Sequence, residues 1–143
     1  MNRQTTQKTL DIWHKCVANK DMAALKTIVH EDAVFRSPMA HTPYPGRAAL
    51  VFALSNVIEI FEGFTYHREL ISEDGKHLFL EFSADVNGKS VKGIDLITIN
   101  DDGLITDFEV MIRPMSGLSA LGAAMAPRMM KMAKALAGGS QSA

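Results

Sequence analysis

Residues 76–113 decide the fold, and they read KHLFLEFSADVNGKSVKGIDLITINDDGLITDFEVMIR. Apolar and polar side chains alternate along much of this stretch, which is typical of strands that bury one face. Asn87-Gly88 and the run Asp-Asp-Gly at 101–103 interrupt the alternation and are typical of hairpin turns. Because such short connections make neighbouring strands antiparallel, the stretch predicts consecutive hairpins. The predicted strands span residues 76–86, 89–99 and 104–113.

A fourth strand and a helix are predicted immediately before this stretch. Glu-Asp-Gly at 73–75 is another turn signal, so residues 64–72 are expected to add one more antiparallel strand. Ahead of that strand, apolar residues recur at helical spacing from Arg47 to Phe61. Gly63 is expected to end this helix, because glycine is the usual residue just past a helix C-terminus.

Two further helices are predicted at the N-terminal side. The first is expected over residues 5–18, and Asp21 is expected to cap a second, shorter one. A short extended stretch follows at 33–37. The two prolines and one glycine within residues 41–46 then predict a stiff loop, of the kind that often rims a site.

A terminal amphipathic helix is predicted after Pro114, where apolar residues repeat at helical steps. Pro127 is expected to kink or divide it, and residues 138–143 are expected to form a disordered tail. The chain, 1–143, is thus expected to be one α+β domain. In it, three N-terminal helices pack on a curved antiparallel sheet, and a C-terminal helix follows.

Composition argues against several classes of protein. The chain has 143 residues, is 47% hydrophobic and carries a net charge of -1, which is ordinary globular composition. Without a cluster of Lys and Arg, no nucleic-acid partner is expected. The N-terminus has no apolar signal stretch and no segment is apolar enough to span a bilayer, so we expect a cytoplasmic protein without a membrane partner. Cys16 is expected to be a buried thiol, and the histidine spacing predicts no metal site.

One acid is expected to face the core. The phase of strand 89–99 that directs Ile97 toward the helices directs Asp95 there too, on a face that is otherwise aliphatic. An enclosed carboxylate loses hydration, so it must find a partner, take up a proton or face a wet cavity. Asp95 is therefore the main candidate for chemistry, and the alternative is that it pairs with Arg113, Lys92 or a backbone amide and only holds the sheet. On strand 104–113, the same reasoning directs inward Leu104, Thr106, Phe108, Val110 and Ile112.

The order of these elements resembles the nuclear transport factor 2-like superfamily, and within it the SnoaL-like polyketide cyclases and their ketosteroid isomerase relatives. The resemblance covers about residues 5–115. The residues that carry it are Asp21, the stretch 30–38, the loop 43–46 and the run from Gly93 to Ile105. It implies a cone-shaped α+β barrel that encloses a pocket, with Phe108, Val110 and Ile112 on the pocket-lining strand.

The resemblance also assigns roles to single residues. It places Asp95 where the isomerases keep a protonated aspartate that stabilises charge on a ligand oxygen. Their general-base aspartate is matched by Ser37 and their phenolic tyrosine by Trp13. A serine cannot act as a base near neutral pH and an indole only donates, so the same mechanism is not expected here. His41, on the stiff loop, is the candidate for a replacement base, and a solvated loop residue is the equal alternative.

Two functions are compatible with these residues. The first is a cofactor-independent isomerase or cyclase that acts on a polyketide-like or steroid-like carbonyl compound by proton transfer. Asp95 would be its acid or oxyanion donor, and His41 its base. The second is a non-catalytic module that binds a lipophilic ligand or serves dimerisation. In either case, the residues expected to surround a small apolar molecule are Trp13, Ser37, Tyr44, Phe61, Phe82, Phe108, Val110 and Ile112.

Three further expectations concern the rest of the chain. Epoxide opening, as in the limonene epoxide hydrolases that share the fold, is less favoured because Arg113 stands near where their acid would be needed. The methionines of the C-terminal helix, Met125 and Met129 among them, are expected to pack or to form a dimer contact, with a flexible lid as the alternative. The outward sheet face carries Ile94 and Met111, so we expect a homodimer paired through it, as superfamily members commonly are.

Overall fold

The meander predicted over residues 64–113 is present in the computed structural model, which describes residues 2–141. Its strands are β3 (Glu62–Ile71), β4 (His77–Val86), β5 (Lys89–Ile99) and β6 (Ile105–Arg113), preceded by β1 (Val29–Arg36) and β2 (Tyr44–Pro45). The helices are α1 (Asn2–Asn19), α2 (Met22–Leu25) with a 3-10 turn at Lys26–Ile28, α3 (Arg47–Ile60) and α4 (Met115–Gln141). The α+β class is confirmed. Asp21 caps α2 as predicted, because its side chain accepts a hydrogen bond of 3.1 Å from the Ala24 amide.

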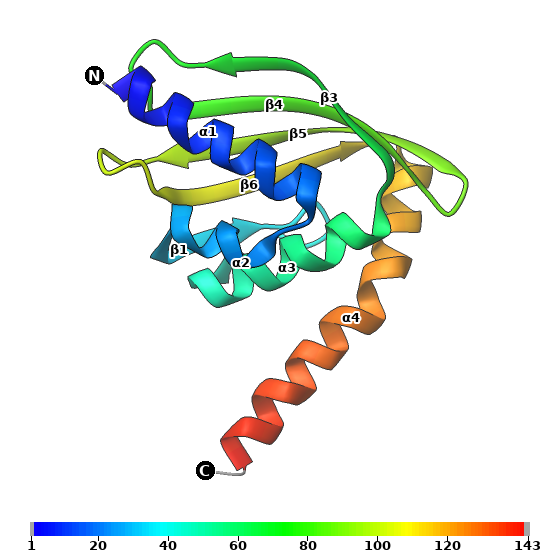
Figure 1. Ribbon diagram of the computed structural model, residues 1–143. Helices are drawn as coiled ribbons and strands as arrows, with labels where there is room; N and C mark the ends of the chain where they lie inside the picture. The colour runs from blue at the N-terminus through cyan, green and yellow to red at the C-terminus, as the bar shows by residue number, and fades with distance from the viewer. Residues whose placement is uncertain (1, 142–143) are drawn as a thin grey trace.

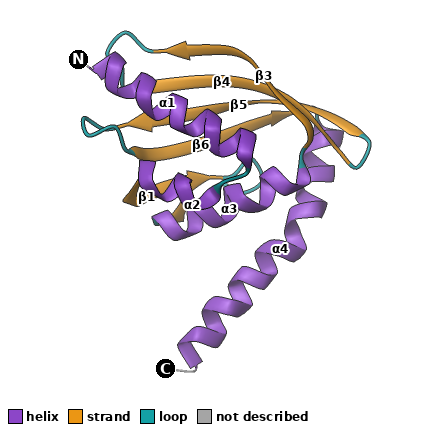
Figure 2. Ribbon diagram, viewed as in Figure 1, coloured by secondary structure: helices purple, strands orange, loops and turns teal. Residues whose placement is uncertain are grey.

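The six strands form one curved sheet in the order β2-β1-β6-β5-β4-β3 (Figure 2). The meander β3 to β6 is antiparallel throughout, as its short turns require. Strand β1 joins β6 in parallel, and β2 then pairs with β1 in the antiparallel sense. Short turns do not predict the pairing of β1 with β6, because α3 and strands β3 to β5 lie between them along the chain.

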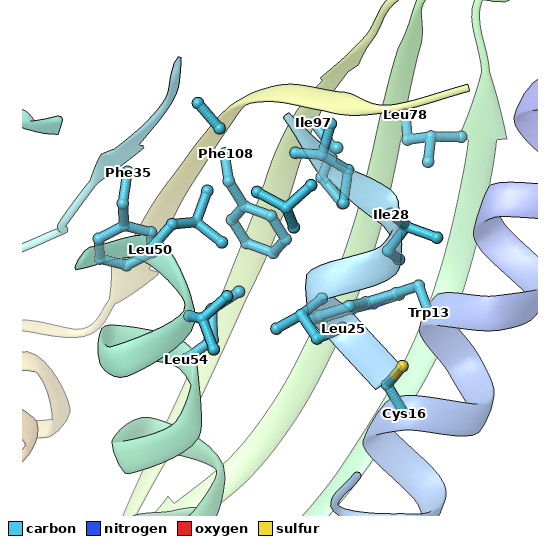
Figure 3. Close-up of a cluster of buried hydrophobic side chains, with 14 of the residues drawn as sticks. Trp13, Cys16, Leu25, Ile28, Phe35, Leu50, Leu54, Leu78, Ile97 and Phe108 are labelled. Carbon is cyan, nitrogen blue, oxygen red and sulfur yellow. The ribbon is translucent and has the colours of Figure 1, made fainter. Parts of the chain in front are cut away.

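Helices α1, α2 and α3 cover one face of the sheet, and the main core lies between them and the strands (Figure 1). In this core, Trp13 and Cys16 of α1 lie near Leu25 of α2, while Leu54 of α3 faces Phe108 of β6 (Figure 3). All of them are buried, including the Cys16 thiol, as expected. Each large apolar side chain buried here contributes roughly 1.5–3 kcal/mol to folding.

The inward phase predicted for strand 104–113 holds only in its C-terminal half. Phe108 is fully buried, but toward the N-terminal end Ile105 is the buried residue, and Leu104 and Thr106 are not. The register between β5 and β6 shifts at this end of the pair. Such an irregularity inserts one residue and moves the following side chains to the other face, which regular alternation cannot anticipate.

Gly63 does not end the third helix, so that prediction is wrong. Helix α3 ends at Ile60, and Phe61 already has extended backbone angles. Gly63 instead lies in β3 with a φ of +61°, next to a register shift between β3 and β4. A positive φ favours glycine, so this residue allows the edge strand to bend and not the helix to stop.

Helix α4 continues through Pro127 to Gln141, and its C-terminal part projects away from the body (Figure 1). Pro127 therefore does not divide it. The tail expected over 138–143 falls partly on this helix, and residues 142–143 lie outside the described residues. Within residues 2–141, no helix is both long enough and apolar enough to cross a bilayer.

We propose that two copies pair through the outer face of the sheet, where Leu70, Phe79 and Met111 are exposed around one shallow depression. Met111→Glu should convert a dimer to a monomer, because it places a charge in an apolar contact. The matched control is Met130→Glu, which changes an exposed methionine on α4. Light scattering after size exclusion measures the mass, and a wild-type monomer at micromolar concentration would contradict the proposal.

Candidate functional site

The structure encloses a cavity of about 320 Å³ between the helices and the sheet. Eight of the ten aromatic side chains of the protein line it. They are Trp13, Phe35, Tyr44, Phe61, Phe64, Tyr66, Phe82 and Phe108. Several pack on one another, with ring centroids of Trp13 and Phe108 5.3 Å apart and those of Phe64 and Phe82 5.1 Å apart. The wall is therefore largely aromatic and apolar, which suits a ligand with little polarity.

Asp95 lies on this wall with only 5% of its surface exposed. Its place on β5 is fixed by cross-strand pairing with Leu80 of β4 and Val110 of β6. The Tyr66 hydroxyl of β3 donates a hydrogen bond of 2.9 Å to Oδ2 of Asp95. The Trp13 indole of α1 in turn donates to the Tyr66 hydroxyl over 2.8 Å. A chain of two hydrogen bonds thus links the first helix to the buried carboxyl.

Burial shifts the pKa values of Asp95 and Tyr66. Loss of hydration raises the pKa of Asp95 from 3.8 to about 7, and the hydrogen bond from Tyr66 opposes this rise. Burial and the nearby Asp95 carboxylate raise the pKa of Tyr66 well above its ordinary value, so Tyr66 stays a neutral hydroxyl. Near neutral pH, Asp95 is therefore divided between its acid and carboxylate forms, whereas Tyr66 does not titrate.

The two carboxyl oxygens of Asp95 have different surroundings. Oδ2 accepts the Tyr66 hydrogen bond, while Oδ1 has no hydrogen-bond partner among the described residues. In the acid form, the proton therefore belongs on Oδ1, because Oδ2 already faces a donor. Oδ1 is then a hydrogen-bond donor on a residue of the cavity wall.

The expected structural partners of Asp95 are not beside it. Lys92 points to the other face of β5, where its ammonium lies 3.0 Å from Glu81. Glu81 also forms two hydrogen bonds of 2.8 Å with the guanidinium of Arg68. Among the described residues that line the cavity, none is lysine, arginine or histidine. In the described part of the chain, Asp95 is thus a buried acid without a cation and without a backbone amide that donates to it. The alternative that it pairs with Arg113, Lys92 or a backbone amide is therefore wrong.

The structure brings together most of the residues predicted for the site. Those that line the cavity with Asp95 are Trp13, Ser37, Tyr44, Phe61, Phe82, Phe108, Val110 and Ile112. Their ligand contacts stay predictions. His41 is not among the described residues of this wall; it borders a neighbouring depression that shares Ser37 and Met39 with the cavity. The geometry therefore places His41 beside the cavity, and its role as a base stays a prediction.

Among the site residues that the sequence reasoning missed, Tyr66 is the one that contacts Asp95. The signal was available, because Phe64 and Tyr66 alternate at strand spacing at the start of β3, and both line the cavity. The His14 ring packs on the edge of Tyr66 with centroids 5.2 Å apart, and its Nε2 lies 2.6 Å from Glu69. The Tyr66 ring therefore packs against His14 of α1 while its hydroxyl reaches Asp95.

Four methionines line the cavity among the described residues. Met125 and Met129 of α4 contribute, together with Met22 and Met39. Arg128 holds α4 against α3, because its guanidinium lies 3.0 Å from both Asn56 Oδ1 and Glu59 Oε2. Met125 and Met129 thus lie on the cavity wall, where flexible thioethers can adapt to a ligand. Whether they serve packing, a dimer contact or a lid stays a prediction. Met132 lies among the residues whose side chains are not described.

Comparison with known proteins agrees with this fold. An NTF-2 like protein of unknown function from Burkholderia xenovorans LB400 has a TM-score of 0.66 at 19% identity, over 81% of this chain and 92% of that one. At this identity the likeness shows the fold alone, which is the nuclear transport factor 2-like cone. Residues 11–108 match the family model of the SnoaL-like domain. The chain belongs to the SnoaL-like domain family.

Two similar structures share more of the sequence. A steroid delta-isomerase from Pseudomonas aeruginosa is 48% identical with a TM-score of 0.88, over 93% of this chain and 97% of that one. An uncharacterized protein with a cystatin-like fold from Silicibacter pomeroyi DSS-3 is 35% identical with a TM-score of 0.83, over 90% of this chain and 89% of that one. None of the curated proteins compared with the chain matches it.

Asp95→Asn should stabilise the protein at and above neutral pH. In the wild type, the folded pKa of about 7 exceeds the ordinary 3.8, so the folded state holds its proton more tightly than the unfolded state. Stability is then lost as pH rises from about 4 to about 7, by up to about 4 kcal/mol. Asparagine removes this loss and still accepts from Tyr66.

Chemical denaturation of both proteins across this pH range measures the effect. The expected difference in unfolding free energy grows between about pH 4 and pH 7 and is then constant. A difference that does not depend on pH would show that Asp95 titrates normally in the folded protein.

Tyr66→Phe should raise the pKa of Asp95 above its value of about 7, because the variant removes the one hydrogen bond that favours the carboxylate. Carbon NMR of the aspartate carboxyl groups follows this titration directly. Tyr44→Phe is the matched control, since Tyr44 also lines the cavity but is not hydrogen-bonded to Asp95. An equal shift in both variants would mean that the cause is a general change in the cavity.

Proposed function

We propose that the protein binds an uncharged, apolar carbonyl compound in this cavity and promotes its isomerisation or cyclisation by proton transfer, without a cofactor. The observation that carries the proposal is one acid, Asp95, with a pKa of about 7 on an otherwise apolar wall. A group with a pKa near the working pH can both give and take a proton. The likeness to a protein named as a steroid delta-isomerase supports a steroid-like or polyketide-like ligand.

The acid form of Asp95 supplies the first part of the chemistry. With Oδ2 accepting from Tyr66, Oδ1 carries the proton and can donate it to the carbonyl oxygen of the ligand. That hydrogen bond strengthens as negative charge develops on the oxygen, and it does so beside a largely apolar wall. The neighbouring carbon–hydrogen bond then becomes more acidic.

The removal of that carbon-bound proton needs an acceptor. The carboxylate form of Asp95 can serve, but one carboxyl cannot donate to the oxygen and accept from the carbon at the same moment. His41 would have to enter the cavity to act as the base predicted from the sequence, because it lies in the adjoining depression. A water molecule in the site is the other acceptor compatible with the polar atoms on the wall.

A second candidate function follows from the lack of a second proton acceptor on the described wall. Among the described residues of the wall, no other carboxyl and no imidazole lies beside Asp95. A module that only stores or senses a lipophilic carbonyl compound needs the apolar wall and one hydrogen-bond donor, and both are present. For such a module, Asp95 would select ligands by their carbonyl oxygen and would not exchange protons with carbon.

Turnover of a β,γ-unsaturated steroid ketone to its conjugated isomer tests the enzyme, with ultraviolet absorbance as the readout. Asp95→Leu removes both donor and acceptor and should lower kcat by about 100- to 1,000-fold. Asp95→Asn keeps an N–H donor, so partial activity would indicate that Asp95 acts on the oxygen. An equal loss of activity in both variants would indicate that Asp95 transfers the carbon-bound proton.

Full activity in Asp95→Leu would contradict the proposed role. If the wild type binds the ketone, as shown by a raised unfolding temperature, but does not convert it, the binding module becomes the better account. Carbon-bound proton exchange of the bound ketone in heavy water, followed by NMR, then decides whether any proton transfer takes place.

A further inference from the structure

The described wall of the cavity holds an acid but no basic side chain. Asp95 is nine-tenths buried, and its hydrogen-bond partner is the neutral hydroxyl of Tyr66. Oδ1 has no partner among the described residues, and no lysine, arginine or histidine is found on the described wall. When Asp95 ionises, the carboxylate therefore has a hydrogen bond but no counter-charge. A cation brought by a ligand would meet an unmatched negative charge in a medium of low polarity, where such a pair is strong.

The aromatic wall favours the same kind of ligand. Ring faces carry partial negative charge and attract ammonium groups, most strongly for tryptophan and tyrosine. Tyr66 contacts Asp95 directly, the Trp13 indole contacts Tyr66, and the Phe64 ring lies 4.8 Å from the Tyr66 ring. These contacts place the carboxyl among aromatic side chains, and the other rings of the wall offer apolar surface to the body of a ligand.

We propose that the same cavity binds lipophilic amines, with the ammonium group of the amine paired to Oδ1 of Asp95 and its ring system against the aromatic wall. The inference rests on the cavity being a ligand site, as in the proposed function. Amine binding and carbonyl binding require different ionisation states of Asp95, because a carbonyl ligand needs the acid and an ammonium ligand needs the carboxylate. An amine of this kind would compete with the carbonyl ligand for one site.

The proton balance of amine binding depends on pH. Below about pH 7, Asp95 begins as the acid, so pairing with an ammonium ligand releases its proton to solvent while the nitrogen keeps its own. Above about pH 7 the carboxylate is already present, and no proton is released. Affinity for the amine should therefore rise with pH through the titration of Asp95, whereas affinity for a neutral ketone should fall.

Asp95 is expected to titrate alone, because the groups that face it from the neighbouring elements are apolar or stay neutral. Tyr66 of β3 stays neutral, since its pKa is raised well above its ordinary value. The cross-strand neighbours on β4 and β6 are Leu80 and Val110, and α1 presents Trp13. On the Tyr66 ring, His14 of α1 is paired with Glu69 of β3. Helices α3 and α4 contribute only apolar side chains and Gly122 to the described wall.

The test uses three probes that share a naphthalene ring: acetonaphthone as the neutral ketone, naphthylethylamine as the ammonium ligand and naphthoate as the anion. Calorimetric titration of the full chain gives the Kd of each at about pH 6 and about pH 8. A pKa of about 7 predicts that the Kd of the amine falls about tenfold over this interval and that the Kd of the ketone rises. Naphthoate should bind weakly at both values, because the wall offers no cation.

Asp95→Asn is the decisive variant. Asparagine keeps a hydrogen-bond donor for the ketone but cannot carry charge, so ketone binding should persist without pH dependence while amine binding falls at least tenfold. Retained ketone binding also shows that the variant is folded. Titrations at about pH 6 in two buffers of different ionisation enthalpy should report close to one proton released per amine bound to the wild type.

Each outcome separates the two proposals. An amine Kd that is the same at both pH values, or unchanged in Asp95→Asn, overturns the amine site. A ketone that binds with the expected pH dependence beside an amine that does not bind overturns the amine site and leaves the proposed function standing. Amine binding without ketone binding overturns the proposed function and leaves the amine site standing. If neither probe binds, both proposals fail.

Discussion

The hydrogen bond from the Tyr66 hydroxyl to Asp95, 2.9 Å long, is the interaction on which the site depends. Burial alone would favour the neutral acid strongly, and this bond moves the balance back toward the carboxylate, to a pKa of about 7. It also fixes which oxygen stays free. Because Trp13 of α1 donates to the same hydroxyl, the position of the first helix and the ionisation of the carboxyl are coupled through one phenol.

The cavity exists because the fold divides its apolar residues between two tasks. Leu25, Leu50 and Ile97 belong to the core under the first three helices and do not line the cavity. The aromatic residues and the methionines of α4 instead surround open space, and Arg128 holds α4 in place against α3. Aromatic rings are rigid, whereas the thioethers of the wall can adapt to a ligand. The site therefore combines fixed and adaptable parts.

The sequence predicted the parts of this arrangement that depend on periodicity and turn chemistry. The meander, the third helix and the inward position of Asp95 follow from alternation, helical spacing and Asn-Gly or Asp-Gly turns. Contacts between residues far apart in the sequence could not be predicted from these patterns. A register shift moved Ile105 to the core, and the approach of Tyr66 to Asp95 joins residues 29 positions apart across two strand pairings. Alternation assigns a face to a residue, but it does not measure the distance between two residues on that face.

Asp95 differs from its isostere asparagine in its ability to ionise. Its described hydrogen bond, received from Tyr66, is one that asparagine would accept equally well through its carbonyl oxygen. A carboxyl at this position costs stability at neutral pH that an amide would not, since the unfolded chain ionises it freely. No structural contact in the described part of the chain compensates for this cost. What asparagine cannot supply is a proton that comes and goes near pH 7, so the property that distinguishes Asp95 from its isostere is the one that a proton-transfer or charge-pairing site requires.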